Sequence, residues 1–274
     1  MFNFLKKLGP GILFAGAAIG VSHLVQSTRA GADFGIGLIW ALLLVNLFKF
    51  PFFQYGPRYA NATGESLLDG YKKLGKNILS IYILISLATM FTIQTAVTIV
   101  TAGIASSLTN NIISVEIWTI IILIICTVLL YFGKYKMLDR MIKIVISILA
   151  LSTIVATCLA FNNFSYDFKL SQVLPKNNIE IAFLIAFMGW MPAPLDVSVW
   201  HSLWTIEKKK SDGVQAMKTT LFDFNIGYIG TIVLGVSFML LGYFVMNGSN
   251  LSFSSSATTF ANQLIEMYTS SFGS

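Results

Sequence analysis

The segment GWMPAPLD, residues 189–196, lies inside a long apolar run and decides how the chain folds. Two prolines two positions apart remove backbone donors and clash with the preceding carbonyls, so they break a helix at this point. Asp196 follows the second proline directly, and a carboxylate at membrane depth is costly unless it meets a partner or water. A broken helix beside such an acid favours a binding site over a simple kink.

The rest of the chain has the composition of a membrane protein. Of 274 residues, 55% are hydrophobic and 11% are charged, whereas about a quarter are charged in an ordinary soluble domain. Apolar runs near the roughly 20 residues needed to cross a bilayer recur along the chain, and the first has no signal-peptide cleavage site. They predict an all-α membrane protein with spans at residues 10–32, 36–56, 78–106, 117–133, 140–161, 180–206 and 221–246.

The basic residues predict the topology. Most of the 18 Lys and Arg residues lie in the N-terminal segment and in alternate connections between spans, such as 134–143 and 208–218. The positive-inside bias therefore predicts a multi-pass protein of the cell (inner) membrane with a cytoplasmic N-terminus. The net charge of +6 is spread over these connections, so we expect no nucleic-acid partner. Cys126 and Cys158, within apolar helices, are expected to be small core residues.

The first span also contains an interruption. Residues 16–23, GAAIGVSH, place small and polar residues at mid-depth, and Gln26 and Ser27 follow. Helical spacing puts His23, Gln26 and Ser27 on one face. Close packing through Gly and Ala, with polar side chains joining helices, explains this pattern as well as a kinked cavity wall does.

The two interruptions are five spans apart, which is the offset expected of inverted five-helix repeats with a site near the midplane. Residues 1–162 would form the first repeat. Residues 163–274 would begin the second, with two spans and the lead-in to a further span. The sequence thus predicts a transporter whose substrate binds between the first and sixth spans.

Other polar residues have simpler explanations. In the third span, Gln94 and Thr98 belong to a stripe at helical spacing that either joins helices or borders the permeation path. Asp139 and Lys143 are four residues apart and form an expected structural pair. Asp223 lies near a helix start, where the helix dipole favours a negative charge.

With these residues located, the sequence resembles the Nramp family of proton-coupled divalent-metal transporters, whose inverted five-helix repeat is the LeuT-like fold. The resemblance lies in residues 9–11 (GPG), 30–32 (AGA), 191–192 (Met-Pro) and 135–143. It covers most of the chain and implies that Met191 is the family's metal-binding methionine.

This chain departs from the family where the chemistry is concentrated. The family's Asp-Pro-Gly-Asn in the first span is here Gly-Val-Ser-His, so Gly20 stands at the metal-binding aspartate position and His23 at the asparagine position. Ala193 replaces a histidine after Met-Pro, and the acidic residue of the third span is absent around Gln94 and Thr98. These changes indicate a divergent bacterial branch of Nramp-related proteins.

The family also has more spans than this chain. Residues 257–269 resemble an amphipathic segment leading into a further span, so we expect the sequence to be a fragment of a longer transporter.

These observations predict a membrane transporter of divalent transition metals such as manganese, iron or zinc, ion-coupled, and not an enzyme. The metal is cargo, and no cofactor is expected; the partners are the lipid bilayer and a small ion or solute. The candidate substrate-binding residues are Gly20, His23, Met188, Met191 and Asp196, with His23 and Met191 as metal ligands because imidazole and thioether suit such cations. The candidate coupling or cavity-lining residues are Gln26, Gln94, Thr98 and His201.

Three alternatives remain open at this point. Gly20 leaves space where the family has a carboxylate, which would suit an organic solute such as an amino acid. A transport-dead sensor or scaffold would explain the missing acids. A membrane metalloenzyme using His23, His201 and Asp196 is the least favoured, because the chain has no metal-ligand motif such as His-Glu-x-x-His.

Overall fold

The computed structural model describes residues 8–133, 135–162, 164, 171–247, 253–254 and 256–273. Within these ranges the regular structure is helical and no strand is present, which confirms the predicted all-α class. Residues 1–7, Lys134 and Lys169, which entered the topology prediction, lie outside the described residues.

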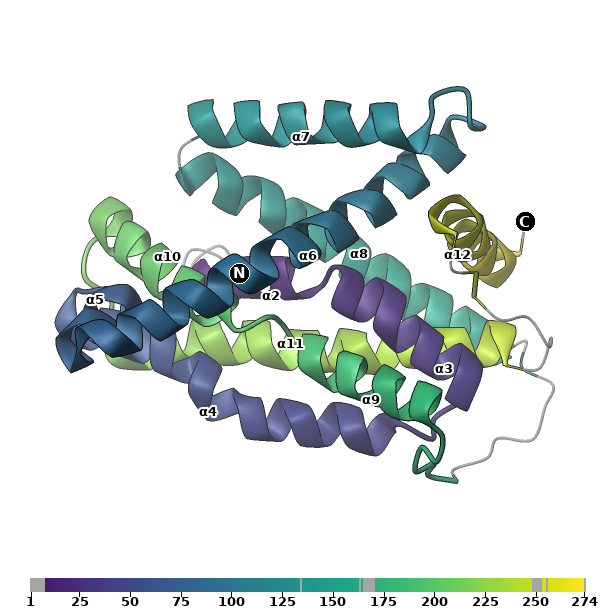
Figure 1. Cartoon of the computed structure of the whole chain (residues 1–274), viewed down its shortest axis with the longest axis horizontal. Helices are drawn as coiled ribbons and strands as arrows, with labels where there is room; N and C mark the ends of the chain where they lie inside the picture. The colour runs from purple at the N-terminus through teal and green to yellow at the C-terminus, as the bar shows by residue number, and fades with distance from the viewer. Residues whose placement is uncertain are drawn as a thin grey trace.

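The helices form a bundle around α11 that includes α8, and α6 and α7 form an arm beside it (Figure 1). In chain order they are α2 (Pro10–Ala18), the π-helix η1 (Ser22–Ser27), α3 (Thr28–Phe34), α4 (Ile39–Thr63), α5 (Leu67–Leu74), α6 (Lys76–Leu108), α7 (Val115–Phe132), α8 (Tyr135–Asn162), α9 (Asn178–Trp190), α10 (Asp196–Asp212), α11 (Met217–Met246) and α12 (Ala257–Phe272).

The spans agree with the sequence prediction except at the sixth. Among the described residues, five helices are long and apolar enough to cross a membrane, and the bent pair formed by Pro10–Ala18 and Ser22–Phe34 makes six. The sixth predicted span, 180–206, consists of two helices that meet at the predicted break. The first, α9, has 13 residues, and α10 continues to Asp212 through three consecutive lysines. The prolines between them separate an apolar helix from a polar one, so this span is not among the long apolar helices.

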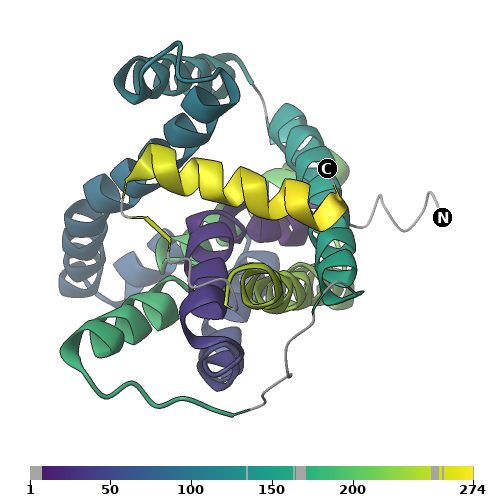
Figure 2. The ribbon, with the colours of Figure 1, turned by 90° about the vertical axis from the view of Figure 1, so that its right-hand side faces the viewer.

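Helix α11 is the centre of the bundle, where it packs against α2, α3, α4 and α8 (Figure 2). Glycines allow its closest approaches: the α-carbon of Gly227 faces the backbone of Gly11, and Gly242 faces the backbone of Thr28. Small residues at such crossings let membrane helices approach closely. The predicted last span therefore packs directly on the predicted first one, and the bounds of the two repeats remain a prediction.

The arm exposes apolar side chains to its surroundings. Helix α7 has no buried residue and packs against α6 (Figure 1). Cys126 on α7 and Cys158 on α8 are both exposed, so the expectation that they are core residues was wrong. In lipid, an apolar helix is stable with its apolar surface exposed, so cysteines in an apolar sequence need not be buried in the protein.

Helix α12 is amphipathic, as the sequence predicts for residues 257–269. Its buried face is formed by Phe260, Leu264 and Met267, which pack with Ala156 of α8 and Leu241 of α11. At 16 residues, α12 is shorter than a membrane span.

Candidate functional site

The first predicted break is present and bends the span by 48°. Helix α2 ends at Ala18, and a π-helix begins at Ser22. Its wider turn replaces the α-helical register in which His23, Gln26 and Ser27 would share one face. Single turns of π-helix inside membrane or soluble helices are frequent at functional sites. The break therefore supplies irregular backbone where the sequence predicts a binding site.

His23 is fully buried at this break, and backbone carbonyls surround its ring. Nε2 lies 3.0 Å from the carbonyl oxygen of Thr231, and Nδ1 lies 2.8 Å from Ser22 Oγ and 3.1 Å from the carbonyl oxygen of Ala18. Both the Thr231 and the Ala18 carbonyl can only accept, so the neutral ring donates to one of them and turns the lone pair of its other nitrogen toward the other. Each ring nitrogen thus faces a backbone carbonyl.

Gly20 lies beside this histidine and is open on its outer side. No heavy atom lies within 4 Å of the position that a Cβ would take. The residue borders a groove of about 280 Å³ between the break and α6, whose walls are mainly apolar. The groove is lined by Gly20, Val21, Leu24, Val97, Val100, Thr101, Ile104, Ala105 and Leu108.

The second predicted break is also present. Helix α9 ends at Trp190, and α10 begins at Asp196 after the two prolines. Ser22 Oγ donates its hydrogen to the Ala18 carbonyl at 2.5 Å and lies 3.4 Å from the carbonyl oxygen of Pro192, so the two breaks are in contact. Residues more than 160 positions apart in the sequence are thus brought together, as the five-span offset predicts.

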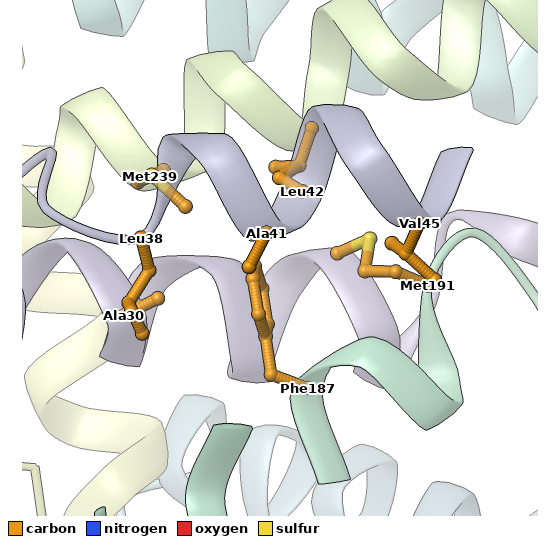
Figure 3. Packing of buried hydrophobic residues seen from close by; sticks show 8 residues of the cluster. All are labelled: Ala30, Leu38, Ala41, Leu42, Val45, Phe187, Met191 and Met239. Atoms are coloured by element: carbon orange, nitrogen blue, oxygen red, sulfur yellow. The ribbon is translucent and has the colours of Figure 1, made fainter. Parts of the chain in front are cut away.

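The two methionines at the second break are apolar packing residues in this structure. Met191 is fully buried in a cluster with Val45, Ala41 and Phe187, and its side chain lies against α4 (Figure 3). Met188 is partly buried against the same cluster. A thioether sulfur packs well in apolar surroundings and can also bind soft cations.

Lys49 also reaches the second break, from α4. Its ammonium donates hydrogen bonds to the carbonyl oxygens of Met188 at 2.9 Å, Gly189 at 2.8 Å and Met191 at 2.7 Å. The sequence places Lys49 within the second span, but nothing in the sequence says which carbonyls it meets. A lone lysine inside an apolar helix was the available signal, because such residues mark functional sites by default.

Asp196 and His201 have partners other than His23. The Asp196 carboxylate accepts a hydrogen bond of 2.7 Å from Ser86 of α6, and the Tyr82 hydroxyl interacts with it as well. His201 is buried against Phe14 and Phe224, and within the described residues its Nδ1 has no hydrogen-bond partner. The structure thus links Asp196 to the third span and His201 to an aromatic cluster, and it joins neither to His23 by a described contact.

The remaining candidate residues are Gln94 and Thr98 on α6 and Gln26 in the π-helix η1. Gln94 Nε2 donates to Thr98 Oγ1 at 2.9 Å, so these two form a pair within α6. Gln26 Oε1 is buried and, in the described part of the chain, has no hydrogen-bond partner. Buried polar atoms of this kind are uncommon in native proteins and often have a functional reason.

Asp223 has a role that the sequence did not indicate. Its two carboxylate oxygens accept hydrogen bonds from the backbone N–H groups of Gly9 at 2.9 Å and Gly11 at 2.8 Å. It therefore caps the N-terminus of α2, where the intervening Pro10 has no N–H, and the prediction that it serves its own helix start was wrong: it lies more than one turn inside α11. Lys143, in the expected pair with Asp139 at 2.6 Å, donates to the Leu8 carbonyl at the same end.

Among the described residues, no group of three or more His, Cys, Asp and Glu side chains gathers in a way that could hold a metal ion. Any dication at the breaks would bind to single side chains together with backbone carbonyls. Paired breaks in two membrane helices, facing each other inside an all-α bundle, are characteristic of secondary transporters.

The chain belongs to the Nramp family, described as natural resistance-associated macrophage protein-like, whose model matches residues 11–272. It is 36% identical over 270 residues to an uncharacterized protein of Pasteurella multocida (strain Pm70), covering 97% of this chain and 62% of that protein. It is 23% identical over 262 residues to the metal transporter NRAT1 of Oryza sativa subsp. japonica, covering 91% of this chain and 47% of that protein. The chain thus spans less than two thirds of the length of either relative.

Family membership confirms the predicted resemblance, and together with the apolar helices it fits a multi-pass membrane protein. At the family level, Nramp proteins are transporters and not enzymes.

Proposed function

We propose that this chain carries the substrate site of an ion-coupled secondary transporter for divalent transition-metal ions such as manganese, iron or zinc. The observation that carries the proposal is the contact between Ser22 at the first break and Pro192 at the second, which brings the two broken spans together in a chain of the Nramp family. Transporters with such breaks bind their substrate near the midplane of the membrane. The predicted inner-membrane location and cytoplasmic N-terminus belong to the same proposal.

His23 supplies the principal ligand in this proposal. In the metal-bound state that we propose, Nε2 donates to the Thr231 carbonyl, which orients the ring, and Nδ1 binds the metal, the arrangement that outer-shell hydrogen bonds give most metal-binding histidines. Met191 would add its sulfur, which favours transition metals over calcium or magnesium. Gly20 contributes no carboxylate, so binding relies on neutral ligands.

Asp196 is the proposed coupling residue. It is the acid nearest in sequence to the second break, and its hydrogen bond to Ser86 joins α10 to α6. A carboxylate in a membrane protein is expected to face water or a partner, and a proton or cation can then neutralise it. Asp196→Asn should abolish the pH dependence of uptake and leave the fold intact.

The test is uptake of radiolabelled manganese by the full-length protein in proteoliposomes. We expect uptake that His23→Ala and Met191→Ala each reduce by about tenfold, the lower end of the effect of losing a metal-site residue. His201→Ala is the matched control, because His201 is an equally buried histidine in an aromatic cluster. If neither His23 nor Met191 affects manganese binding measured by calorimetry, the metal proposal is wrong.

An organic solute such as an amino acid is the second candidate, and the open space beside Gly20 is the observation that favours it. A groove with apolar walls suits a side chain better than it suits a hydrated metal ion. Uptake of labelled amino acids by the same proteoliposomes distinguishes the organic-solute candidate from the metal candidate. Uptake of an amino acid with no manganese binding would establish this candidate instead.

A further inference from the structure

The Lys49 ammonium of α4 binds to backbone carbonyls at the C-terminal end of α9. The carbonyl oxygens of Met188, Gly189 and Met191 lie 2.9, 2.8 and 2.7 Å from Lys49 Nζ. An ammonium has three N–H donors, so these three carbonyls use all of them. We call this set of three oxygens the carbonyl cage.

The carbonyl cage has the chemistry of a cation site. The last carbonyls of a helix have no partner within the helix, and they form the negative end of its dipole. Here the prolines prevent the chain from continuing in a way that would satisfy them. Rings of backbone carbonyls are also how channel filters replace the water around a monovalent cation.

Lys49 is directed to the cage by its position on α4. Val45, one turn earlier on the same face, packs beside Met191 (Figure 3). The described part of the chain gives Lys49 no ion pair with a carboxylate. In the described part of the chain, backbone dipoles are therefore the partners of this charge, which would be expensive within a membrane without them.

We propose that the carbonyl cage is a monovalent-cation site whose resident occupant is the Lys49 ammonium, and that this tethered charge keeps free cations out of the cage. The second clause rests on the proposed function: a cargo dication is then held by the His23 ring and the Met191 sulfur outside the cage, where Lys49 repels its charge. Removal of the ammonium should open the cage to a small free cation and strengthen dication binding.

Chemical rescue tests the first clause without any transport measurement. Thermal unfolding of Lys49→Ala, in the full-length protein in detergent, is compared in methylammonium chloride and in tetramethylammonium chloride at equal ionic strength. We expect methylammonium to raise the Tm of the variant by about 2–4 °C or more, because a ligand that binds only the folded state stabilises it. Tetramethylammonium has no N–H donor. The wild type and Lys72→Ala, which removes an exposed lysine, should not respond.

A second variant covers the case in which Lys49→Ala does not fold. Lys49→Cys, in a background with Cys126 and Cys158 replaced by alanine, can be modified with an aminoethyl or a trimethylammonioethyl methanethiosulfonate reagent. The aminoethyl product restores an ammonium with three donors and should recover the wild-type Tm. The trimethyl product restores only the charge and should not. If both reagents restore the Tm equally, or if methylammonium does not raise the Tm of Lys49→Ala, the proposal that the carbonyl cage is a cation site is wrong.

Manganese binding to Lys49→Met then tests the competition. We expect the affinity to rise about fivefold or more, at the lower end of typical coupling energies between sites. An unchanged affinity overturns the second clause. If neither wild type nor variant binds manganese while methylammonium still rescues Lys49→Ala, the proposed function fails and the cation site stands.

Discussion

Replacement of Asp223 by alanine should destabilise the bundle where α2 begins. The carboxylate accepts hydrogen bonds from the N–H groups of Gly9 and Gly11, and only 3% of the residue is exposed. Alanine would leave both donors buried without an acceptor and would remove the negative charge that faces the positive end of the α2 dipole. Lys208 and Lys143, which both donate to the Leu8 carbonyl, would lose a nearby counter-charge.

The magnitude follows from these contacts. Removing one partner of a buried charged interaction costs about 3–5 kcal/mol, because the groups left behind are unpaired. For a protein of this size, about 2–4 °C of Tm corresponds to 1 kcal/mol, so Asp223→Ala should lower the Tm by roughly 6–20 °C. Asp223→Asn keeps one oxygen acceptor and turns a donor toward the second N–H, so its loss should be smaller, about 1–3 kcal/mol.

Thermal unfolding of the purified protein in detergent measures both losses, with Glu266→Ala as the control. Glu266 is exposed on α12, and its loss should shift the Tm by less than about 2 °C. The reasoning is refuted if Asp223→Ala unfolds within 2 °C of Glu266→Ala, or if asparagine costs as much as alanine. The first result would mean that water satisfies the N-terminus of α2, and the second that charge matters and the hydrogen bonds do not.

Two further predictions concern helix packing and a helix cap. Gly227→Ala should cost about 1–3 kcal/mol, because its Cβ would meet the backbone of Gly11, whereas Gly230→Ala, where the space is open, should be neutral or slightly stabilising; the unfolding midpoints of the two variants decide it. Ser66→Ala should cost about 1 kcal/mol by removing the N-cap of α5. The Ser66 hydroxyl and N–H groups lower the pKa of Asp69, so the difference between wild type and Ser66→Ala should be full above about pH 3.9 and fade as the pH falls through the lowered pKa; a difference that grows in acid would contradict this.

The breaks could be predicted because their causes are local. Pro192 and Pro194, only two residues apart, interrupt their helix, whereas Pro51 and Pro57 lie six residues apart inside α4. In the first span, glycines among the small residues before Ser22 weaken the helix through their conformational freedom. The membrane-spanning helices could be predicted from the apolar runs, because the thickness of a bilayer sets the length of a span. In the sixth span, the prolines predict the break that hydropathy misses, because hydropathy averages over the break and merges apolar α9 with polar α10.

The partners at the breaks could not be predicted, because most of them are backbone atoms. His23 meets the carbonyls of Ala18 and Thr231, Lys49 meets three carbonyls of α9 and its end, and Asp223 meets two N–H groups. Every residue has such groups, so no side-chain pattern distinguishes the ones that are used. What the sequence does show is the charged residue itself, alone in an apolar helix without an opposite charge at helical spacing. In a membrane protein such a residue requires a partner, and where the nearby helix is broken, the free ends of its backbone are the first place to look.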